Sequence, residues 1–78
     1  MDQLSKMRWR ARRGMREMDH LFDQYLENHY ATSSAEEKKL LAELLEMQDP
    51  ELFDLLMFKV EPHSEDLALL MKKINPHL

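Results

Sequence analysis

Four histidines are the side chains of this sequence that are best suited to bind a transition metal: His20, His29, His63 and His77. None of them stands at a ligand spacing such as H-E-x-x-H. Asp23 follows His20 at helical spacing, but such a pair is common on a solvated helix face. We therefore interpret the histidines as surface residues and predict no metal site.

The sequence gives equally little support for nucleophilic catalysis or for phosphate binding. The chain has no cysteine, so it lacks thiolate nucleophiles, thiolate metal ligands and disulfides. No serine lies in a G-x-S-x-G elbow, and Gly14, the only glycine, cannot build a glycine-rich phosphate loop. A helical domain of 78 residues also has little room for a ligand-sized pocket. We predict that the protein is not an enzyme.

The arginines of the N-terminal segment are the one unusual concentration of charged side chains in the sequence. Residues 1–16 hold six basic side chains and one acidic side chain, a net charge of +5, whereas the other 62 residues hold 5 basic and 14 acidic side chains, a net charge of −9. Trp9 stands among these arginines, and an exposed Trp beside Arg is typical of protein interfaces. Trp9, Arg12, Arg13 and Arg16 would share an outward side if one helix continued through Gly14.

Two other interpretations of this basic segment stay open. It can be a solvated charge face with Trp9 half-buried, or it can neutralise nucleic-acid phosphates. The acidic remainder, the pI of about 5.5 and the lack of a nucleic-acid-binding signature speak against the second, so we predict no nucleic-acid partner.

The elements that must position these residues are predicted to be helices, because apolar residues recur with helical periodicity. Leu4, Met7 and Ala11 recur at three- and four-residue spacing, which predicts a helix over 2–13 with Trp9 nearly opposite that stripe. Gly14 predicts the C-cap of this helix or a sharp bend. A second helix is expected over 17–30, with one apolar face: Met18, Leu21, Phe22, Tyr25, Leu26 and Tyr30.

Three further helices are expected after a loop over 31–34. Ser33 or Ser34 can begin the third, and Ser64 can cap the fifth, which should stop before Pro76. Asp49 with Pro50 predicts the start of a fourth helix over 51–58, which is apolar nearly all round and should be the most buried. The sequence thus predicts an all-α fold, a compact antiparallel bundle of about five short helices that forms a single domain over 1–78.

Two segments match a known signature. Residues 13–19 read R-G-M-R-E-M-D, and residues 44–53 read L-L-E-M-Q-D-P-E-L-F. Together with the basic, Trp-containing first helix, they resemble the R-G-x-R-E-x-D and L-L-E-x-x-D-P-D/E-L-F patterns of the SdhE-type proteins, the succinate dehydrogenase assembly factor 2 or flavinator family. The resemblance covers roughly residues 7–74.

This resemblance implies a five-helix bundle that binds the flavoprotein subunit of succinate dehydrogenase, and in bacteria that of fumarate reductase, and promotes covalent attachment of FAD to it. Carried over to this chain, the docking surface comprises Arg13, Gly14, Arg16, Glu17 and Asp19, with Trp9 and Arg12 beside it. Met15 and Met18 are expected to pack inside.

The same resemblance, together with the composition, gives the remaining expectations. No cofactor is expected to be tightly bound, since the FAD belongs to the partner. We expect a cytoplasmic protein, since the lack of cysteine suits a reducing compartment, and we expect a monomer. No membrane insertion is expected, because no apolar run approaches the roughly 18 residues of a membrane span. The alternative function is a small helical adaptor whose basic helix binds nucleic acid or another acidic partner. The chain departs from the family at Leu55, where many members present an aromatic side chain, and ends soon after the fifth helix.

Overall fold

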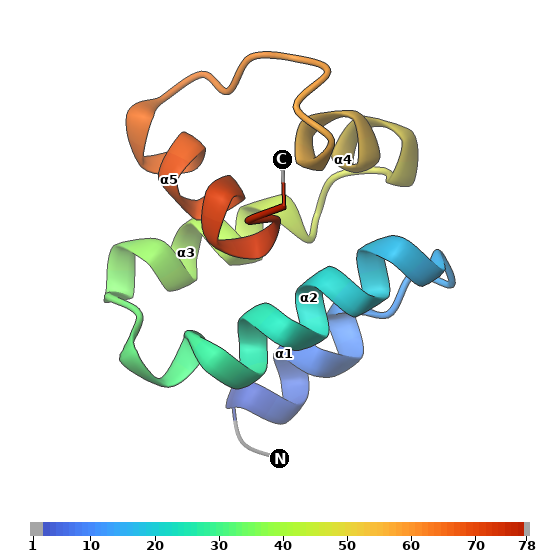
Figure 1. Ribbon diagram of the computed structural model, residues 1–78. Helices are drawn as coiled ribbons and strands as arrows, with labels where there is room; N and C mark the ends of the chain where they lie inside the picture. The colour runs from blue at the N-terminus through green and yellow to red at the C-terminus, as the bar shows by residue number, and fades with distance from the viewer. Residues whose placement is uncertain (1–2, 78) are drawn as a thin grey trace.

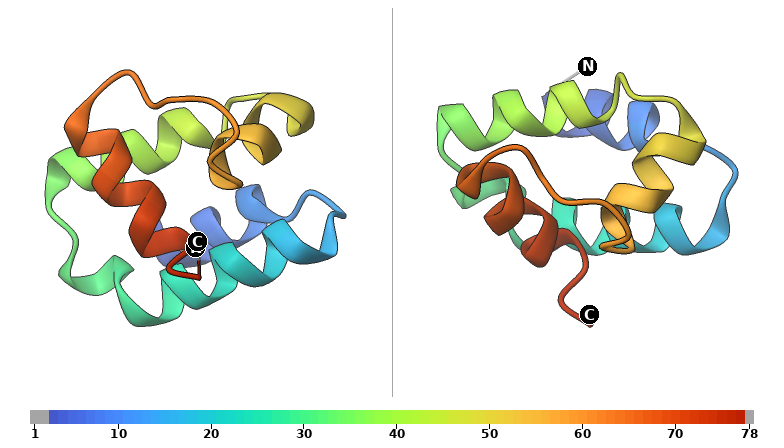
Figure 2. Two further views of the ribbon diagram at one scale, coloured as in Figure 1. Left: turned by 45° about the horizontal axis from the view of Figure 1, so that its top comes forward. Right: turned by 90° about the horizontal axis from the view of Figure 1, so that it is seen from above.

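The protein folds into two layers of helices, seen in a computed structural model that describes residues 3–77 (Figure 1). Helices α1 (Gln3–Ala11) and α2 (Arg16–Asn28) form an antiparallel hairpin in the lower layer. Helices α3 (Ala35–Leu44), α4 (Asp49–Leu56) and α5 (Glu65–Ile74) cover that hairpin. The left view of Figure 2 shows the same layering, with α3 above α1 and the connector between α4 and α5 arching over the top, and the right view shows this connector from above. The all-α prediction is confirmed.

The core is built from the apolar stripes that the sequence predicts. All six apolar residues of the second stripe, from Met18 to Tyr30, are buried, and Met7 and Ala11 close the hairpin from α1. From the upper layer, α3 and α5 contribute Leu41, Leu44 and four residues of α5: Leu67, Leu70, Met71 and Ile74. Burial of these side chains between the layers supplies the main driving force for folding.

Serine caps set the starts of two helices as expected. The Ser34 side chain accepts a hydrogen bond from the Glu37 N–H, and the Ser64 side chain accepts one from the Leu67 N–H, both at 3.1 Å. These bonds satisfy backbone donors that a helix start leaves unpaired. Ser33 does not begin α3, because its hydroxyl contacts Tyr25, His29 and Glu37 instead. A short 3-10 turn over Tyr30–Thr32 occupies part of the segment that we expected as a loop.

Helix α4 differs from its prediction in three ways. It begins at Asp49 with Gln48 as the N-cap, so Asp49 is not the capping residue. It ends at Leu56, because Phe58 takes a left-handed conformation (φ 59°) and the Lys59 N–H then bonds to the Asp54 carbonyl, which closes the helix end. It is also not the most buried helix, since it buries three residues where α5 buries four and α2 five.

A buried amide joins the ends of α4 and α5. Asn75 is 4% exposed, and its Nδ2 donates to the Leu56 carbonyl at 2.9 Å. This bond satisfies a carbonyl that the end of α4 leaves free. Leu55, the position at which the sequence departs from the family pattern, is also buried.

Candidate docking surface at the turn between α1 and α2

A four-residue turn joins α1 and α2. Helix α1 ends at Ala11, two residues earlier than predicted, and the Arg12 N–H still reaches the Trp9 carbonyl at 3.3 Å. Gly14 makes the bend in the left-handed region (φ 77°), which glycine adopts without steric cost. It is therefore the sharp bend of the two alternatives that the sequence left open. A Cβ at Gly14 would meet no other atom within 4 Å, so the position faces open space.

Arg13 points inward and fastens this turn to the upper layer. One terminal nitrogen, Nη1, donates to the Met47 carbonyl at 2.6 Å and pairs with Asp49 Oδ1 at 2.9 Å, and Nη2 donates to the Leu45 carbonyl. The Arg13 side chain is only 12% exposed, whereas that of Asp49 is 44% exposed. The planar guanidinium suits this role because it presents several donors in a fixed fork.

Asp19 holds the same turn from its other side. Its Oδ1 accepts a hydrogen bond from the Arg13 N–H at 2.9 Å, and Asp19 lies in the first turn of α2, where a carboxylate favours the positive end of the helix. Arg10 adds a further tie between layers, since its Nη2 donates to the Ala42 carbonyl at 3.3 Å. The turn is thus fixed by hydrogen bonds to three different segments.

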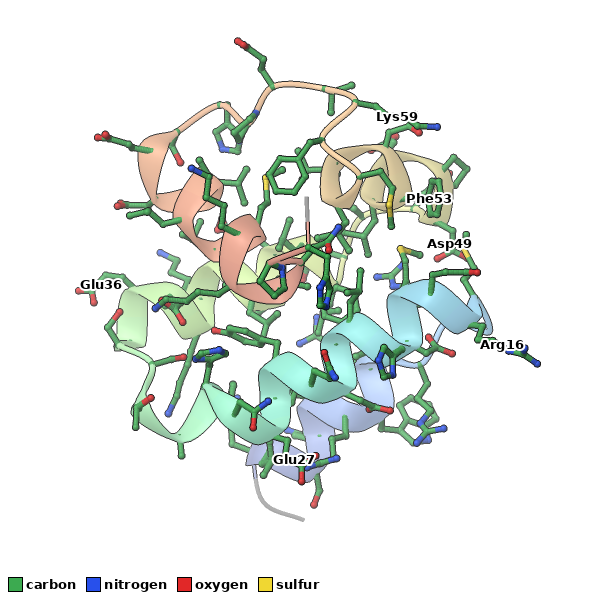
Figure 3. All side chains as sticks on the ribbon, in the orientation of Figure 1. Arg16, Glu27, Glu36, Asp49, Phe53 and Lys59 are labelled. Carbon is green, nitrogen blue, oxygen red and sulfur yellow. The ribbon has the colours of Figure 1, made fainter. Side chains whose placement is uncertain are left out.

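The opposite side of the turn carries unpaired charge. Arg12, Gly14, Arg16 and Glu17 are exposed, and Trp9 is 79% exposed on the adjoining face of α1. Neither of the two ion pairs found between residues 3 and 77 involves Arg12, Arg16 or Glu17. Figure 3 shows the Arg16 side chain pointing away from the molecule. We call Trp9, Arg12, Gly14, Arg16 and Glu17 the outer surface of the turn.

The structure therefore divides the residues that the sequence grouped. The shared outward side of Arg13 with Trp9, Arg12 and Arg16 required one helix through Gly14, and this condition is not met: α1 stops before Arg13, and the chain turns Arg13 inward. Asp19 likewise bonds within the turn. Met18 is fully buried and Met15 packs against the core, which confirms their expected packing role.

Sequence reasoning missed that the two signature segments form one unit. Arg13 belongs to the first, and its three partners (Leu45, Met47 and Asp49) all belong to the second. We had interpreted Asp49 only as a helix cap. One indication of a further role for Asp49 was present in the sequence, namely its position in a signature segment. Neither signature segment, however, indicates that Asp49 contacts Arg13.

A second polar cluster lies at the other end of the molecule. The Tyr25 hydroxyl donates to Glu37 Oε2 at 2.5 Å, Ser33 donates to the same oxygen at 2.7 Å, and Lys73 pairs with Glu37 Oε1 at 2.8 Å. Burial alone would raise the pKa of Glu37, but the hydrogen bonds from Lys73, Ser33 and Tyr25 outweigh it and lower the pKa to about 2. Burial and the bond to Glu37 raise the pKa of the Tyr25 hydroxyl. This cluster ties α2, α3 and α5 together.

Elsewhere, the described residues form no cluster of three or more His, Cys, Asp or Glu side chains that could hold a metal ion. All four histidines are exposed. The cavities of this part of the chain measure about 240–360 Å³. No helix among residues 3–77 is long and apolar enough to cross a membrane.

Comparisons with known proteins agree with the signature segments. Residues 5–78 match the family model described as the flavinator of succinate dehydrogenase. The FAD assembly factor SdhE of Acinetobacter baylyi is 42% identical over 73 residues, which are 94% of this chain and 86% of that protein. The proteins of the same name from Shewanella oneidensis and Coxiella burnetii are 46% and 36% identical, over 92% and 90% of this chain and over 88% and 85% of their own lengths. No solved structure matches the chain. The chain belongs to the family of succinate dehydrogenase flavinators.

Proposed function

We propose that this protein binds the flavoprotein subunit of succinate dehydrogenase through the outer surface of the turn and thereby promotes covalent attachment of FAD to that subunit. The observation that carries the proposal is the exposed, unpaired set of Arg12, Arg16 and Glu17 around Gly14, on a backbone fixed by Arg13 and Asp19. Membership of the flavinator family supports the choice of client.

The outer surface of the turn has chemistry suited to recognising a charged protein surface. Guanidinium groups of Arg12 and Arg16 can pair with carboxylates of the client, and Glu17 can accept hydrogen bonds from an arginine or histidine there. The open space at Gly14 lets the client backbone approach closely. Trp9 adds a large apolar contact at the margin.

Binding alone is sufficient for the proposed activity. A protein that binds the attachment-competent state of its client more tightly than other states increases the population of that state. The flavin and the client then carry out the bond formation, so this chain needs neither a catalytic group nor a tightly bound cofactor. The flavoprotein subunit of fumarate reductase is a second client within the same proposal.

Co-expression with the flavoprotein subunit tests this function, with covalent flavin measured by its fluorescence on a denaturing gel. We expect covalent flavin to rise with the protein present and to fall with Arg16→Ala or Glu17→Ala. Glu27→Ala, on the exposed far end of α2, is the matched control and should leave the yield unchanged. Equal covalent flavin with and without the protein would refute the proposal.

Docking through this surface is tested separately by pull-down with the purified subunit. Glu17→Ala should weaken capture of the subunit, whereas Glu27→Ala should not. Capture that is equally strong for both variants would place the interface elsewhere on the molecule, even if the flavin yield depends on the protein.

A further inference from the structure

A groove runs between α3 and α5, from the loop that follows α3 at one end to the start of α3 at the other. Three cavities of about 270, 270 and 360 Å³ adjoin one another along it, because all three are lined by Leu40 and successive cavities share Glu43, Glu36 or Asp66. We call this feature the α3–α5 groove. Figure 3 shows Glu36, on its wall, and Arg16, on the turn, at opposite sides of the molecule.

One cavity of the α3–α5 groove is lined mainly by apolar residues, and exposed acidic side chains border the groove. Leu44, Leu55 and Leu67 form the floor of one 270 Å³ cavity, with Leu40 and Met47 beside them. On the rim, Glu36, Glu43 and Asp66 take part in neither ion pair of the described chain. Lys39 and His63 also line the rim. The apolar cavity alone, at about 270 Å³, is large enough to take one large side chain.

A surface that is complementary to this groove lies on the same protein, around Trp9. Trp9 is the most exposed of the large apolar side chains among residues 3–77, at 79%. Lys6 stands three residues before it on α1, and Arg12 stands three residues after it in the turn. Both are exposed, so a cation lies on either side of Trp9 along the chain. A Trp between two cations matches an apolar cavity with carboxylates on its rim, in both shape and charge.

We propose that copies of this protein associate head to tail, with Trp9 of one copy inserted into the α3–α5 groove of the next and Lys6 and Arg12 against the rim carboxylates. Trp9 is 79% exposed and therefore does not fill the groove of its own copy. The proposed contact joins two different surfaces, Trp9 and the groove, so it is heterologous. The contact is small and reversible, so the monomer expected from the sequence stays the species that acts in dilute solution.

This association has a consequence that rests on the proposed function. Trp9 and Arg12 belong to the outer surface of the turn, so a copy held in the groove of another cannot dock at the same time. Self-association and docking then compete for one surface. At high concentrations of this protein, a smaller fraction of the copies therefore has that surface free to bind the client.

The test uses sedimentation equilibrium of the full chain over a concentration series up to the millimolar range. We expect the mean mass to rise with concentration at low ionic strength and to return to the monomer value at high salt, where charges separated by solvent are screened. Emission from Trp9, the only tryptophan, should shift to shorter wavelength as the mass rises. A monomer at all concentrations, or a mass increase without an emission shift, would overturn the proposal.

Two variants then test whether Trp9 and the α3–α5 groove are the two sides of one contact. Trp9→Ala lacks the inserted side chain, and Glu43→Lys has a groove that repels the flanking cations, so each should stay monomeric alone. Mixed, they should form a dimer of one copy each, because the first still offers a groove and the second still offers Trp9. Glu27→Lys makes the same charge change on exposed α2 and should associate as the unmodified protein does.

The mixture has one further readout. Since Trp9→Ala has no tryptophan, all emission comes from the Glu43→Lys copy, and its shift reports insertion into the other copy's groove. Absence of the mixed dimer, or association of Glu43→Lys alone at undiminished strength, would exclude the groove as the binding site. Neither result depends on the client, so failure here leaves the proposed flavinylation role standing.

Discussion

Replacing Arg13 with methionine should destabilise the whole domain, although Arg13 lies beside the proposed docking surface. Methionine keeps the apolar stem but removes the guanidinium that bonds to the Leu45 and Met47 carbonyls and to Asp49. A hydrogen bond from a charged group contributes about 1.5–3 kcal/mol, and a half-exposed ion pair contributes about 1 kcal/mol or less. Because water can partly replace the lost donors, we expect a net loss of about 3 kcal/mol.

That loss is large but measurable on a folded protein. A domain of this length is stable by roughly 4–12 kcal/mol, so Arg13→Met should fold and melt earlier. At about 4–8 °C per kcal/mol for a domain this small, the midpoint should fall by roughly 15 °C. Thermal unfolding followed by circular dichroism measures this shift, with urea unfolding as the independent check.

Arg12 provides the matched control, since it is the neighbouring arginine but is exposed and forms no ion pair with any residue of 3–77. Arg12→Met should change stability by no more than about 0.5 kcal/mol while weakening capture of the client. Asp49→Asn, which alters only the half-exposed partner, should cost less than about 1 kcal/mol. An Arg13→Met protein as stable as Arg12→Met would refute the inward role of Arg13.

Three further predictions concern other parts of the fold. Gly14→Ala should lower the free energy of unfolding by about 1–2 kcal/mol in urea titrations, because the position is left-handed although it has space; Gly14→Asn should cost less. Glu37→Gln should lower stability by up to about 3 kcal/mol near neutral pH, as expected for a carboxyl whose pKa falls from 4.5 to about 2. Because that pKa is lowered in the folded protein, the contribution is fully present above pH 4.5 and disappears as the pH falls towards 2; unfolding free energies of both proteins across this range should converge, and parallel curves would contradict the assignment. Asn75→Ala should cost about 1–2 kcal/mol through the unpaired Leu56 carbonyl, whereas the exposed Asn28→Ala should be nearly neutral in the same melting assay.

Local patterns predicted much of this fold because helices are local structures. The buried face of α2 follows directly from three- and four-residue spacing, and Ser34 and Ser64 cap their helices through bonds that span three residues. The exposure of Trp9 follows from the same geometry. These features depend on residues that are neighbours along one helix.

Features that depend on contacts between residues far apart in the chain could not be predicted from the sequence. Arg13 and Asp49 lie 36 positions apart, and no local pattern indicates that they meet. The left-handed conformation of Phe58 could not be predicted for another reason. That conformation is favoured by glycine, so a phenylalanine does not indicate the end of a helix. In the candidate site, composition drew attention to the basic segment, but only the packed helices decide which arginine turns inward and which stays exposed.

The fastening of the turn by Arg13 also limits how the docking surface can be reproduced outside this protein. The backbone around Gly14 takes its shape from carbonyls of Leu45 and Met47, in the loop that follows α3. A synthetic peptide covering residues 9–19 would contain every residue of the outer surface of the turn but none of these anchors. Such a peptide should be a poor competitor for the client, and grafting the surface onto another scaffold would require both signature segments together.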